Sequence, residues 1–415
     1  MLFCRMETNG NPTHLYDCIV IGGGISGISF AHKLQERGDD ILLLEKEQRL
    51  GGQIQTHISS HDPYFWSELG AHTCYNSYTR LLSMVMDLHI EQYIRPLEGY
   101  KYMLYADGKI NNVMSKVSVP SLVMHGPRLF FTSKSGKTVR EYFRPIVGSK
   151  NYDRLFSNMF RAVICQKADD YPAELFLKGR KERLKQFPRK FTFERGLSSL
   201  LAHIVQTSGF NHLKDEEVSE VRYDNRTYSV TTRKGNRFLG KRIAFATSPH
   251  VVSRLLREIE PEMAKLLYTI PMVESGTLNV VVRKDHLPVQ RVAGIIPVTD
   301  DFFSAVSRDG VDHPALRGFS FHYGQHQQDP ERMSDLACKV LGISREDIVE
   351  TKFTSHILPS LRMQHRNMAR QIENVRSNDS VFMLGNYFYG LSLEDCVHRS
   401  FDEYIRLSGQ VPVYL

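Results

Sequence analysis

The chain has 415 residues, of which 41% are hydrophobic and 24% are charged, and its formal net charge is +7. These values are ordinary for a soluble globular protein of roughly two to three domain-sized units, and they argue against genomic nucleic acid as a partner. No stretch approaches about eighteen consecutive apolar residues, which argues against a membrane-spanning helix. Residues 1–14 lack the apolar core of a signal peptide, so we interpret them as a short polar extension and expect a cytoplasmic protein.

The six cysteines are widely spaced and include no CxxC pair. That spacing argues against a zinc site or a redox-active dithiol, and it is typical of buried, reduced thiols. The 17 histidines include no HxxxH or HExxH pair on a predicted helix. We therefore expect no metal.

Residues 17–27 predict a turn that binds the phosphates of a dinucleotide. A buried apolar strand, residues 18–21, leads into a glycine-rich turn and then a helix. Gly22 lets the chain reverse, Gly24 lets the backbone approach a pyrophosphate, and Gly27 lets the helix pack closely on the strand. The N-terminus of that helix then directs its free N–H groups at the phosphates.

The next segment indicates which dinucleotide binds. A second apolar strand, residues 41–44, ends at Glu45, which is placed to accept hydrogen bonds from a ribose 2′-OH and so favours an unphosphorylated ribose. Arg49 and the pair Gly51-Gly52 follow. They resemble the extension of flavoenzymes in which an arginine and a second glycine pair meet the pyrophosphate and the ribityl chain. This resemblance favours FAD over NAD.

The later segments predict an α/β protein in which a discontinuous Rossmann-like FAD-binding domain carries an inserted α+β substrate domain. Alternating apolar residues at 277–282 and 293–298 predict strands of a second sheet, and 381–385 predicts a last strand before a helix at 394–407. The sequence also predicts the boundaries of the two domains. Residues 14–90, 190–250 and 355–415 form the FAD-binding domain, and residues 91–189 and 251–354 form the substrate-binding domain.

Basic side chains crowd residues 178–190, where seven lysines and arginines face a single acid, Glu182. One interpretation is the solvated face of a helix. The other is attraction to an anionic substrate or to an acidic membrane surface, which would allow a peripheral membrane contact.

The C-terminal motif carries the most specific family resemblance. Residues 385–397, Gly-Asn-Tyr-Phe-Tyr-Gly-Leu-Ser-Leu-Glu-Asp-Cys-Val, resemble the closing motif of the flavin-containing amine oxidase superfamily. Within it, the chain looks most like the protoporphyrinogen oxidases of heme synthesis. Residues 193–200, residues 293–297 and the pair Pro359 and His365 are also similar to that group.

The resemblance implies that FAD is bound without a covalent link by residues from both ends of the chain. The implied contacts are Gly22, Gly23, Gly24, Ile25, Ser26, Gly27, Glu45, Lys46, Arg49, Gly51, Gly52, Gln53, Gly70, Ala71, Val218, Gly385, Asn386, Leu391, Ser392 and Leu393. Of these, Val218 would offer its backbone to the adenine, and Leu391, Ser392 and Leu393 would lie beneath the flavin pyrimidine. A helix N-terminus there would stabilise the negative charge of a reduced flavin. An ordinary N-cap at Ser392 or Asp395 is the alternative interpretation.

Two segments depart from the protoporphyrinogen oxidases, and the second of them, residues 161–165, differs from the glycine-rich run of that group. Glu68-Leu-Gly70-Ala71-His72-Thr73 looks closer to generic amine oxidases and desaturases. We take His72 as the candidate catalytic residue, either to meet a substrate propionate or to steer a proton, with simple hydrogen-bonded structure as the alternative. Four tyrosines could line an apolar slot for a flat macrocycle or belong to the core of a sheet: Tyr93, Tyr100, Tyr102 and Tyr105.

The resulting hypothesis is an FAD-dependent oxidase that removes hydride equivalents from a porphyrinogen-like substrate, converting protoporphyrinogen to protoporphyrin in heme biosynthesis. Its partners would be a small apolar or anionic substrate and oxygen or another electron acceptor. An amine oxidase or a carotenoid-type desaturase of the same superfamily is one alternative. A flavin-dependent sugar mutase and a catalytically silent flavoprotein are alternatives from other classes.

Overall fold

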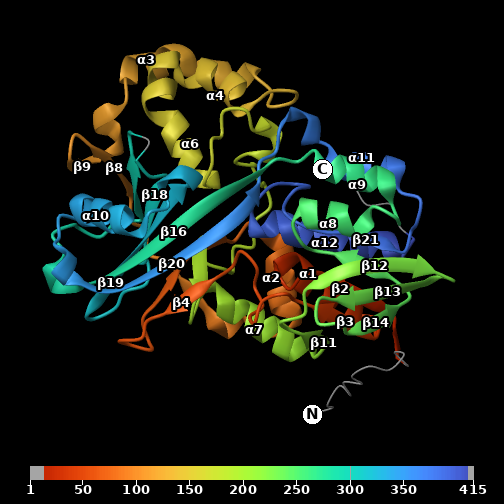
Figure 1. Ribbon diagram of the computed structural model, residues 1–415. Helices are drawn as coiled ribbons and strands as arrows, with labels where there is room; N and C mark the ends of the chain where they lie inside the picture. The colour runs from red at the N-terminus through yellow and green to blue at the C-terminus, as the bar shows by residue number, and fades with distance from the viewer. Residues whose placement is uncertain (1–13, 300, 410–415) are drawn as a thin grey trace.

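A five-stranded parallel sheet forms the centre of one half of the molecule in the computed structural model, which describes residues 14–299 and 301–409 (Figure 1). Its neighbouring strands pair in the order β11 (Asn211–Leu213), β3 (Ile41–Leu44), β2 (Cys18–Ile21), β15 (Ile243–Phe245) and β21 (Val381–Met383). The sheet therefore joins segments from both ends of the chain. Most of the predicted polar extension, residues 1–13, lies outside the described residues.

The central strands are buried on both faces, as parallel strands usually are. Every residue of β2 and β3 is buried. On one face, a hydrophobic core includes residues of α1 (Ile25–Glu36), α7 (Leu197–Ser208) and α12 (Leu393–Leu407). The predicted α/β fold class with a Rossmann-like domain is confirmed.

A four-stranded sheet and a helix cover the other face. Its order is β1 (Leu15–Tyr16), β14 (Arg237–Gly240), β13 (Thr227–Thr232) and β12 (Val218–Asp224). Side chains of these strands and of α8 (Pro249–Leu256) share one hydrophobic core with β2 and β21.

The second half of the molecule contains a seven-stranded sheet. Its order is β20 (Ile348–Pro359), β16 (Met272–Arg283), β19 (Leu316–Gly324), β18 (Ser304–Ser307), β17 (Gly294–Pro297), β8 (Tyr102–Ala106) and β9 (Lys109–Asn112). The predicted strands at 277–282 and 293–298 lie in this sheet as β16 and β17. The domain boundaries stay predictions, and the one between 354 and 355 falls inside β20.

Short helices lie together beside β8 and β9, at the top of Figure 1. They are α3 (Val119–His125), η3 (Gly126–Phe131), α4 (Val139–Val147) and α6 (Ser157–Ile164). The remaining longer helices are α2 (Thr79–Asp87), α9 (Pro261–Tyr268), α10 (Pro330–Leu341) and α11 (Met368–Val375). In the part of the chain that the structure describes, no helix combines the length and the apolar character needed to cross a bilayer.

The basic segment at 178–190 does not form the predicted helix. Residues 177–189 are irregular, and Lys190 begins the short strand β10 (Lys190–Phe193). Two of the cations reach a carboxylate near the start of α12, since Lys178 Nζ lies 3.2 Å and Arg180 Nη2 lies 2.9 Å from Asp395 Oδ1. The helix-face interpretation is therefore wrong, because the segment is irregular and ion pairs to Asp395 hold its first residues against α12.

Candidate functional site

The glycines of the first turn have different steric roles. Gly22 has φ +110°, a conformation that L side chains rarely adopt, and a Cβ there would lie 2.6 Å from the carbonyl oxygen of Ala246. A Cβ at Gly27 would overlap the carbonyl oxygen of Gly22, so only glycine allows α1 to approach the strand this closely. At Gly24, by contrast, a Cβ would have no atom nearer than 4.0 Å. Gly24 thus faces the open space that a bound pyrophosphate requires.

The N-terminus of α1 at this space is available to an anion. No side chain caps the helix at Gly24, and its first turn holds no acidic residue. The first N–H groups of a helix have no acceptor within the helix and carry partial positive charge. The open space over Gly24 and the uncapped helix end therefore fit the phosphates of a dinucleotide such as FAD.

Glu45 lies at the end of β3 and contacts the glycine-rich turn between β2 and α1 directly. Its Oε2 accepts a hydrogen bond from Gly23 N at 2.7 Å, and its Oε1 accepts one from Glu47 N at 2.9 Å. Each carboxylate oxygen keeps a second lone pair, so ribose hydroxyls can still bind. Lys46, in contrast, exposes its side chain and pairs with Glu47 at 3.3 Å, which directs its charge toward solvent.

The second glycine pair is joined to the first turn. Gly51 N donates to Gly23 O at 2.8 Å, and Gly51 forms an isolated β-bridge with Gly24. Arg49 holds the same loop, because its Nη2 donates to Gly52 O at 2.9 Å and its Nη1 donates to the carbonyl of Ile54 at 3.2 Å. The structure therefore brings together the two glycine motifs that the sequence placed far apart.

Two further predicted residues lie beside this cluster. The backbone of Glu216 donates to Glu45 O at 2.8 Å, which brings Val218, two residues later at the start of β12, to the same end of β3. On the other side, Gln53 Nε2 donates to Ile357 O of β20 at 3.2 Å. The predicted adenine contact at Val218 and the Gln53 contact stay predictions.

The loop of Gly70, Ala71 and His72 packs tightly against the second glycine loop. A Cβ at Gly70 would collide with the carbonyl oxygen of Gln53, so glycine is needed for this approach. From the seven-stranded sheet, His356 Nε2 lies 3.0 Å from the carbonyl oxygen of Leu69. This loop is thus one of the places where the five-stranded half meets the seven-stranded half.

The C-terminal motif supplies a second helix N-terminus. Gly385 and Gly390 have φ +135° and +133°, and Asn386 follows the first of them. Ser392 is the N-cap of α12, because its Oγ accepts from Asp395 N at 3.1 Å while Asp395 Oδ2 accepts from Ser392 Oγ at 2.6 Å. The N-cap interpretation is confirmed. The flavin contact of Leu391, Ser392 and Leu393 is compatible with it and stays a prediction.

A hydrogen bond connects the helices of the two motifs. Ser400 Oγ, on α12, donates to Ser26 O in the first turn of α1 at 2.8 Å. Both helices pack in one core over β2 and β3. Residues from the two ends of the chain therefore meet at one site.

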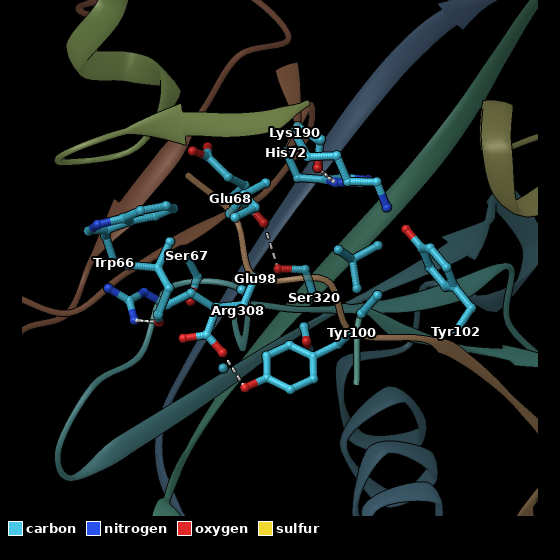
Figure 2. Close-up of a pocket in the computed structure, with 18 of the residues that line it drawn as sticks. Trp66, Ser67, Glu68, His72, Glu98, Tyr100, Tyr102, Lys190, Arg308 and Ser320 are labelled. Carbon is cyan, nitrogen blue, oxygen red and sulfur yellow. Dashed lines mark hydrogen bonds between the residues drawn. The ribbon is translucent and has the colours of Figure 1, made fainter. Parts of the chain in front are cut away.

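A pocket that is partly open to solvent lies between the His72 loop and the seven-stranded sheet (Figure 2). Tyr100 and Tyr102 line it, as the slot interpretation predicts. Tyr93 instead stacks on His203 with ring centroids 3.9 Å apart, and Tyr105 is buried in the sheet core. Two of the four tyrosines therefore line a pocket, and the macrocycle as its ligand stays a prediction.

His72 lines the pocket as an uncharged side chain. Burial, together with the nearby charge of Lys190, lowers the pKa of His72 to about 4. Its Nδ1 lies 2.9 Å from Thr73 Oγ1. A neutral imidazole cannot form an ion pair with a propionate at pH 7, but it can hydrogen-bond to a substrate or accept a proton.

Sequence reasoning missed Arg308, which lies across the pocket from Lys190. Its guanidinium lies over the rings of Phe65 and Trp66, 4.7 and 4.8 Å from their centroids. Nη1 donates to Val311 O at 2.6 Å, whereas Nε is buried without a hydrogen-bond partner. Burial lowers the pKa of Arg308 to about 10, so the group stays charged at neutral pH.

The pocket has an excess of positive charge. Within the described residues, neither Arg308 nor Lys190 forms an ion pair, although the negative charges of Asp312 and Asp309 lie near enough to Arg308 to raise its pKa. Burial raises the pKa of Glu68 to about 8, so this acid is mostly uncharged at pH 7. Glu98, the other acidic residue of the lining, accepts a hydrogen bond from Tyr100 and lies 3.9 Å from Arg291. The arrangement suits an anionic group of a ligand.

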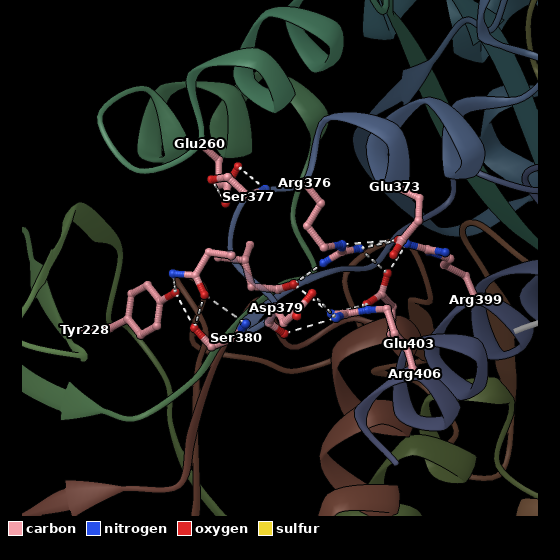
Figure 3. A network of polar contacts seen from close by, with 12 residues as sticks. Tyr228, Glu260, Glu373, Arg376, Ser377, Asp379, Ser380, Arg399, Glu403 and Arg406 are labelled. Atoms are coloured by element: carbon pink, nitrogen blue, oxygen red, sulfur yellow. Dashed lines mark hydrogen bonds and ion pairs between the residues drawn. The ribbon is translucent and has the colours of Figure 1, made fainter. Parts of the chain in front are cut away.

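A buried ion cluster fixes α12, and with it the second helix N-terminus (Figure 3). Glu403 is 1% exposed and pairs with Arg399, with Arg376 at 3.0 Å and with Arg406 at 2.8 Å. Arg399 Nε also donates to Met383 O at 2.9 Å, and Arg406 Nη2 donates to Val381 O at 2.9 Å. These bonds attach α12 to β21 and hold the helix in place against the sheet.

Comparisons with known proteins agree with this geometry. The pattern of the flavin-containing amine oxidoreductases matches residues 25–299. An L-amino acid dehydrogenase of Synechocystis sp. is 24% identical over 296 residues, which cover 63% of this chain and 62% of the relative. The flavin-containing amine oxidase A of Sus scrofa is 36% identical over 89 residues, which cover 21% of this chain and 16% of that enzyme. The chain thus spans less than two thirds of these relatives.

The fold is also similar to a solved structure from Exiguobacterium sp. 255-15, described provisionally as a protoporphyrinogen oxidase. The TM-score is 0.74 at 15% identity, with 96% of this chain and 99% of the other covered. A fatty acid isomerase from P. acnes gives 0.75 at 14% identity, with 94% and 98% covered. Because the family pattern matches more than half of its residues, the chain belongs to the flavin-containing amine oxidoreductase family.

Proposed function

We propose that this protein is an FAD-dependent oxidase that removes hydride equivalents from a flat, anionic substrate of the porphyrinogen type. The observation that carries the proposal is the pair of cations in the pocket, Arg308 and Lys190, which have no carboxylate partner among the described residues. Tyr100 and Tyr102 offer aromatic surface beside them. Carboxylates of a substrate would pair with the cations while its rings contact the tyrosines.

The chain's own residues have limited chemical tasks in this proposal. FAD, when bound, supplies the acceptor of the hydride equivalent. The first turn, Glu45 and the loop of Arg49 would hold the cofactor, and Arg308 would orient the substrate by its carboxylate. A porphyrinogen loses its N–H proton readily as conjugation grows, so no strong base is needed. Neutral His72 can accept a hydrogen bond from the substrate, while its pKa of about 4 makes it a weak base for that proton.

An amine oxidase is the second candidate, because the Gly70-Ala71-His72 form and the matched relatives resemble enzymes of that kind. The positive charge of the pocket separates two kinds of amine substrate, polyamines and L-amino acids. A polyamine would bring positive charge to Arg308 and Lys190, whereas an L-amino acid carries a carboxylate that could pair with Arg308. The pocket therefore favours a carboxylate-bearing substrate over a purely cationic one.

The substrate assay compares these classes in the purified holoprotein. We expect porphyrin fluorescence to appear from protoporphyrinogen well above the rate of autoxidation measured without the protein. Hydrogen peroxide production from a polyamine or an L-amino acid, with no excess fluorescence, would favour the amine oxidase. Turnover of a nucleotide sugar would instead support the mutase alternative. Flavin that no tested donor reduces would indicate the catalytically silent flavoprotein.

Substitution of Arg308 tests the role of the pocket charge. We expect Arg308→Gln to raise KM for the carboxylate substrate about 10-fold to 100-fold with kcat much less affected, because a hydrogen-bonded charge pair is lost from substrate binding. The dimethyl ester of the substrate should show no such difference between wild type and variant. Arg332→Gln, on the exposed face of α10, is the control. An equal KM increase for acid and ester would contradict the role of Arg308.

A further inference from the structure

The basic segment at 178–190 places two cations at the start of α12. Arg180 Nη2 lies 2.9 Å from Asp395 Oδ1 and donates to Ser392 Oγ at 2.9 Å. Lys178 Nζ lies 3.2 Å from the same carboxylate oxygen. The side chains of Lys178 and Arg180 are only 19% and 24% exposed, so salt screens their charges weakly. Two cations therefore face one carboxylate at the N-cap of this helix.

The net charge at this helix end is positive. The first turn of α12 also contains Glu394, whose carboxylate accepts hydrogen bonds from two backbone N–H groups of α2, at 2.9 and 3.1 Å. Burial raises the pKa of Glu394 to about 7, so this acid carries only part of its charge at neutral pH. Burial lowers the pKa of Lys178, whereas a guanidinium keeps its proton in proteins. Arg180 is therefore the main cation, and the first N–H groups of the helix add partial positive charge.

The start of α12 lies between the glycine-rich turn of α1 and the pocket. Ser400, which bonds to the first turn of α1, lies about two helical turns after Ser392, so the N-terminus of α12 is roughly 12 Å along the helix from the phosphate site. Arg180 lies over the ring of Tyr78, 5.2 Å from its centroid, and that ring packs edge-on against Tyr75, which lines the pocket. A cofactor that binds its phosphates at α1 and presents its ring to the pocket therefore passes this helix end.

We propose that Arg180, together with Lys178, raises the reduction potential of the bound FAD. Oxidised flavin that takes up two electrons and one proton becomes an anion, and positive charge beside the ring favours that anion over the neutral oxidised form. The carboxylate of Asp395, which caps the helix, would oppose reduction if the two cations did not offset its charge. The inference rests on the FAD oxidase proposed above and on the predicted flavin contact of residues 391–393.

The inference assigns a role to only part of the basic segment. Lys178 and Arg180 direct their charges into the protein, and Lys190 lines the pocket. Lys185 is exposed and forms no ion pair within the described residues, so it provides a matched control from the same segment. A peripheral membrane contact of these remaining cations stays a prediction.

The test is a reductive titration of the FAD-loaded protein with dithionite, in the presence of a reference dye of known potential. We expect Arg180→Gln to shift the two-electron equilibrium about tenfold toward the oxidised flavin, which corresponds to a potential about 30 mV lower. Arg180→Lys should stay within about twofold of the wild type, because it keeps the charge. Lys185→Gln should match the wild type.

Asp395→Asn makes the opposite change of charge and keeps an oxygen that can accept from Ser392. We expect it to shift the equilibrium toward the reduced flavin, whereas a merely structural role would move Asp395→Asn and Arg180→Gln in the same direction. Lys178→Gln should shift the equilibrium toward the oxidised flavin, and it replaces Arg180→Gln if that variant does not retain FAD.

Two results would overturn the proposal. One is an equal potential in the wild type and in the FAD-loaded variants Arg180→Gln and Lys178→Gln. The other is a shift toward the oxidised flavin in Asp395→Asn. The titration contains no substrate, so failure of the porphyrinogen assay and failure of this inference are distinguishable.

Discussion

Gly24→Val is expected to give a folded protein that has lost its flavin. The backbone at Gly24 has φ −77° and ψ 177°, which any residue adopts, and the nearest atom to a Cβ there is 4.0 Å away. The protein itself therefore tolerates the side chain, at a cost of about 1 kcal/mol because valine is a poor N-cap. The branched side chain would fill the space that the pyrophosphate needs, so we expect almost no flavin absorbance at 450 nm per mole of purified protein.

Two companion variants separate cofactor loss from misfolding. Gly24→Ser restores a good N-cap and should also lose the flavin, because its hydroxyl occupies the same space and competes for the first N–H groups of α1. Gly99→Val, at a glycine outside the left-handed region and with open surroundings, should keep it. Circular dichroism melting measures the folding of all three. Full flavin absorbance in Gly24→Val would rule out the first turn as the phosphate site.

Glu403→Gln is expected to lower the free energy of unfolding by about 3–5 kcal/mol, because it leaves three arginines near one another without their carboxylate. Two of them, Arg376 and Arg399, are almost completely buried. Urea unfolding followed by circular dichroism measures the change. Glu373→Gln is the control, since Glu373 pairs with Arg376 at 3.2 Å from a partly exposed position and should cost less than about 1 kcal/mol. Similar losses in both variants would contradict the central role of Glu403.

The lowered pKa of Glu403 predicts how the stability of the protein changes in acid. Burial by itself would raise the pKa of Glu403, but Arg399, Arg376 and Arg406 outweigh it, and the pKa lies below its ordinary value. A lowered pKa in the folded state means that the stabilisation is present above the unfolded pKa of about 4.3 and is lost as pH falls toward the folded value. We expect the stability of the wild type to fall more steeply below pH 4 than that of Glu403→Gln.

The cofactor turn could be predicted from the sequence because its chemistry is local. Gly22, Gly24 and Gly27 follow from the steric needs of one strand, one turn and one helix, and Glu45 follows from the end of the next strand. The last helix was predictable for a similar reason, since Ser392 and Asp395 form a capping box within four residues. In each case, the residues that specify the structure are neighbours in the chain.

Arg308 could not be predicted, because its surroundings come from separate parts of the chain. The arginine lies between β18 and β19, outside any motif, and Phe65 and Trp66 reach it from the far N-terminal third. The helix-face interpretation of residues 178–190 was wrong for a related reason. Its composition allows a helix, but bonds to Asp395, more than 200 residues away, decide its course. The uncharged state of His72 likewise depends on burial that only the fold produces.

The bond between Ser400 and Ser26 joins residues 374 positions apart. The ribosome makes the glycine turn early, but α12 and the neighbouring strand β21 emerge only when synthesis is nearly finished. A nascent polypeptide that stops before residue 381 has neither the last strand of the parallel sheet nor the helix that packs on α1. We therefore expect flavin to bind only after these last elements have formed, and we expect a polypeptide truncated before β21 to bind none.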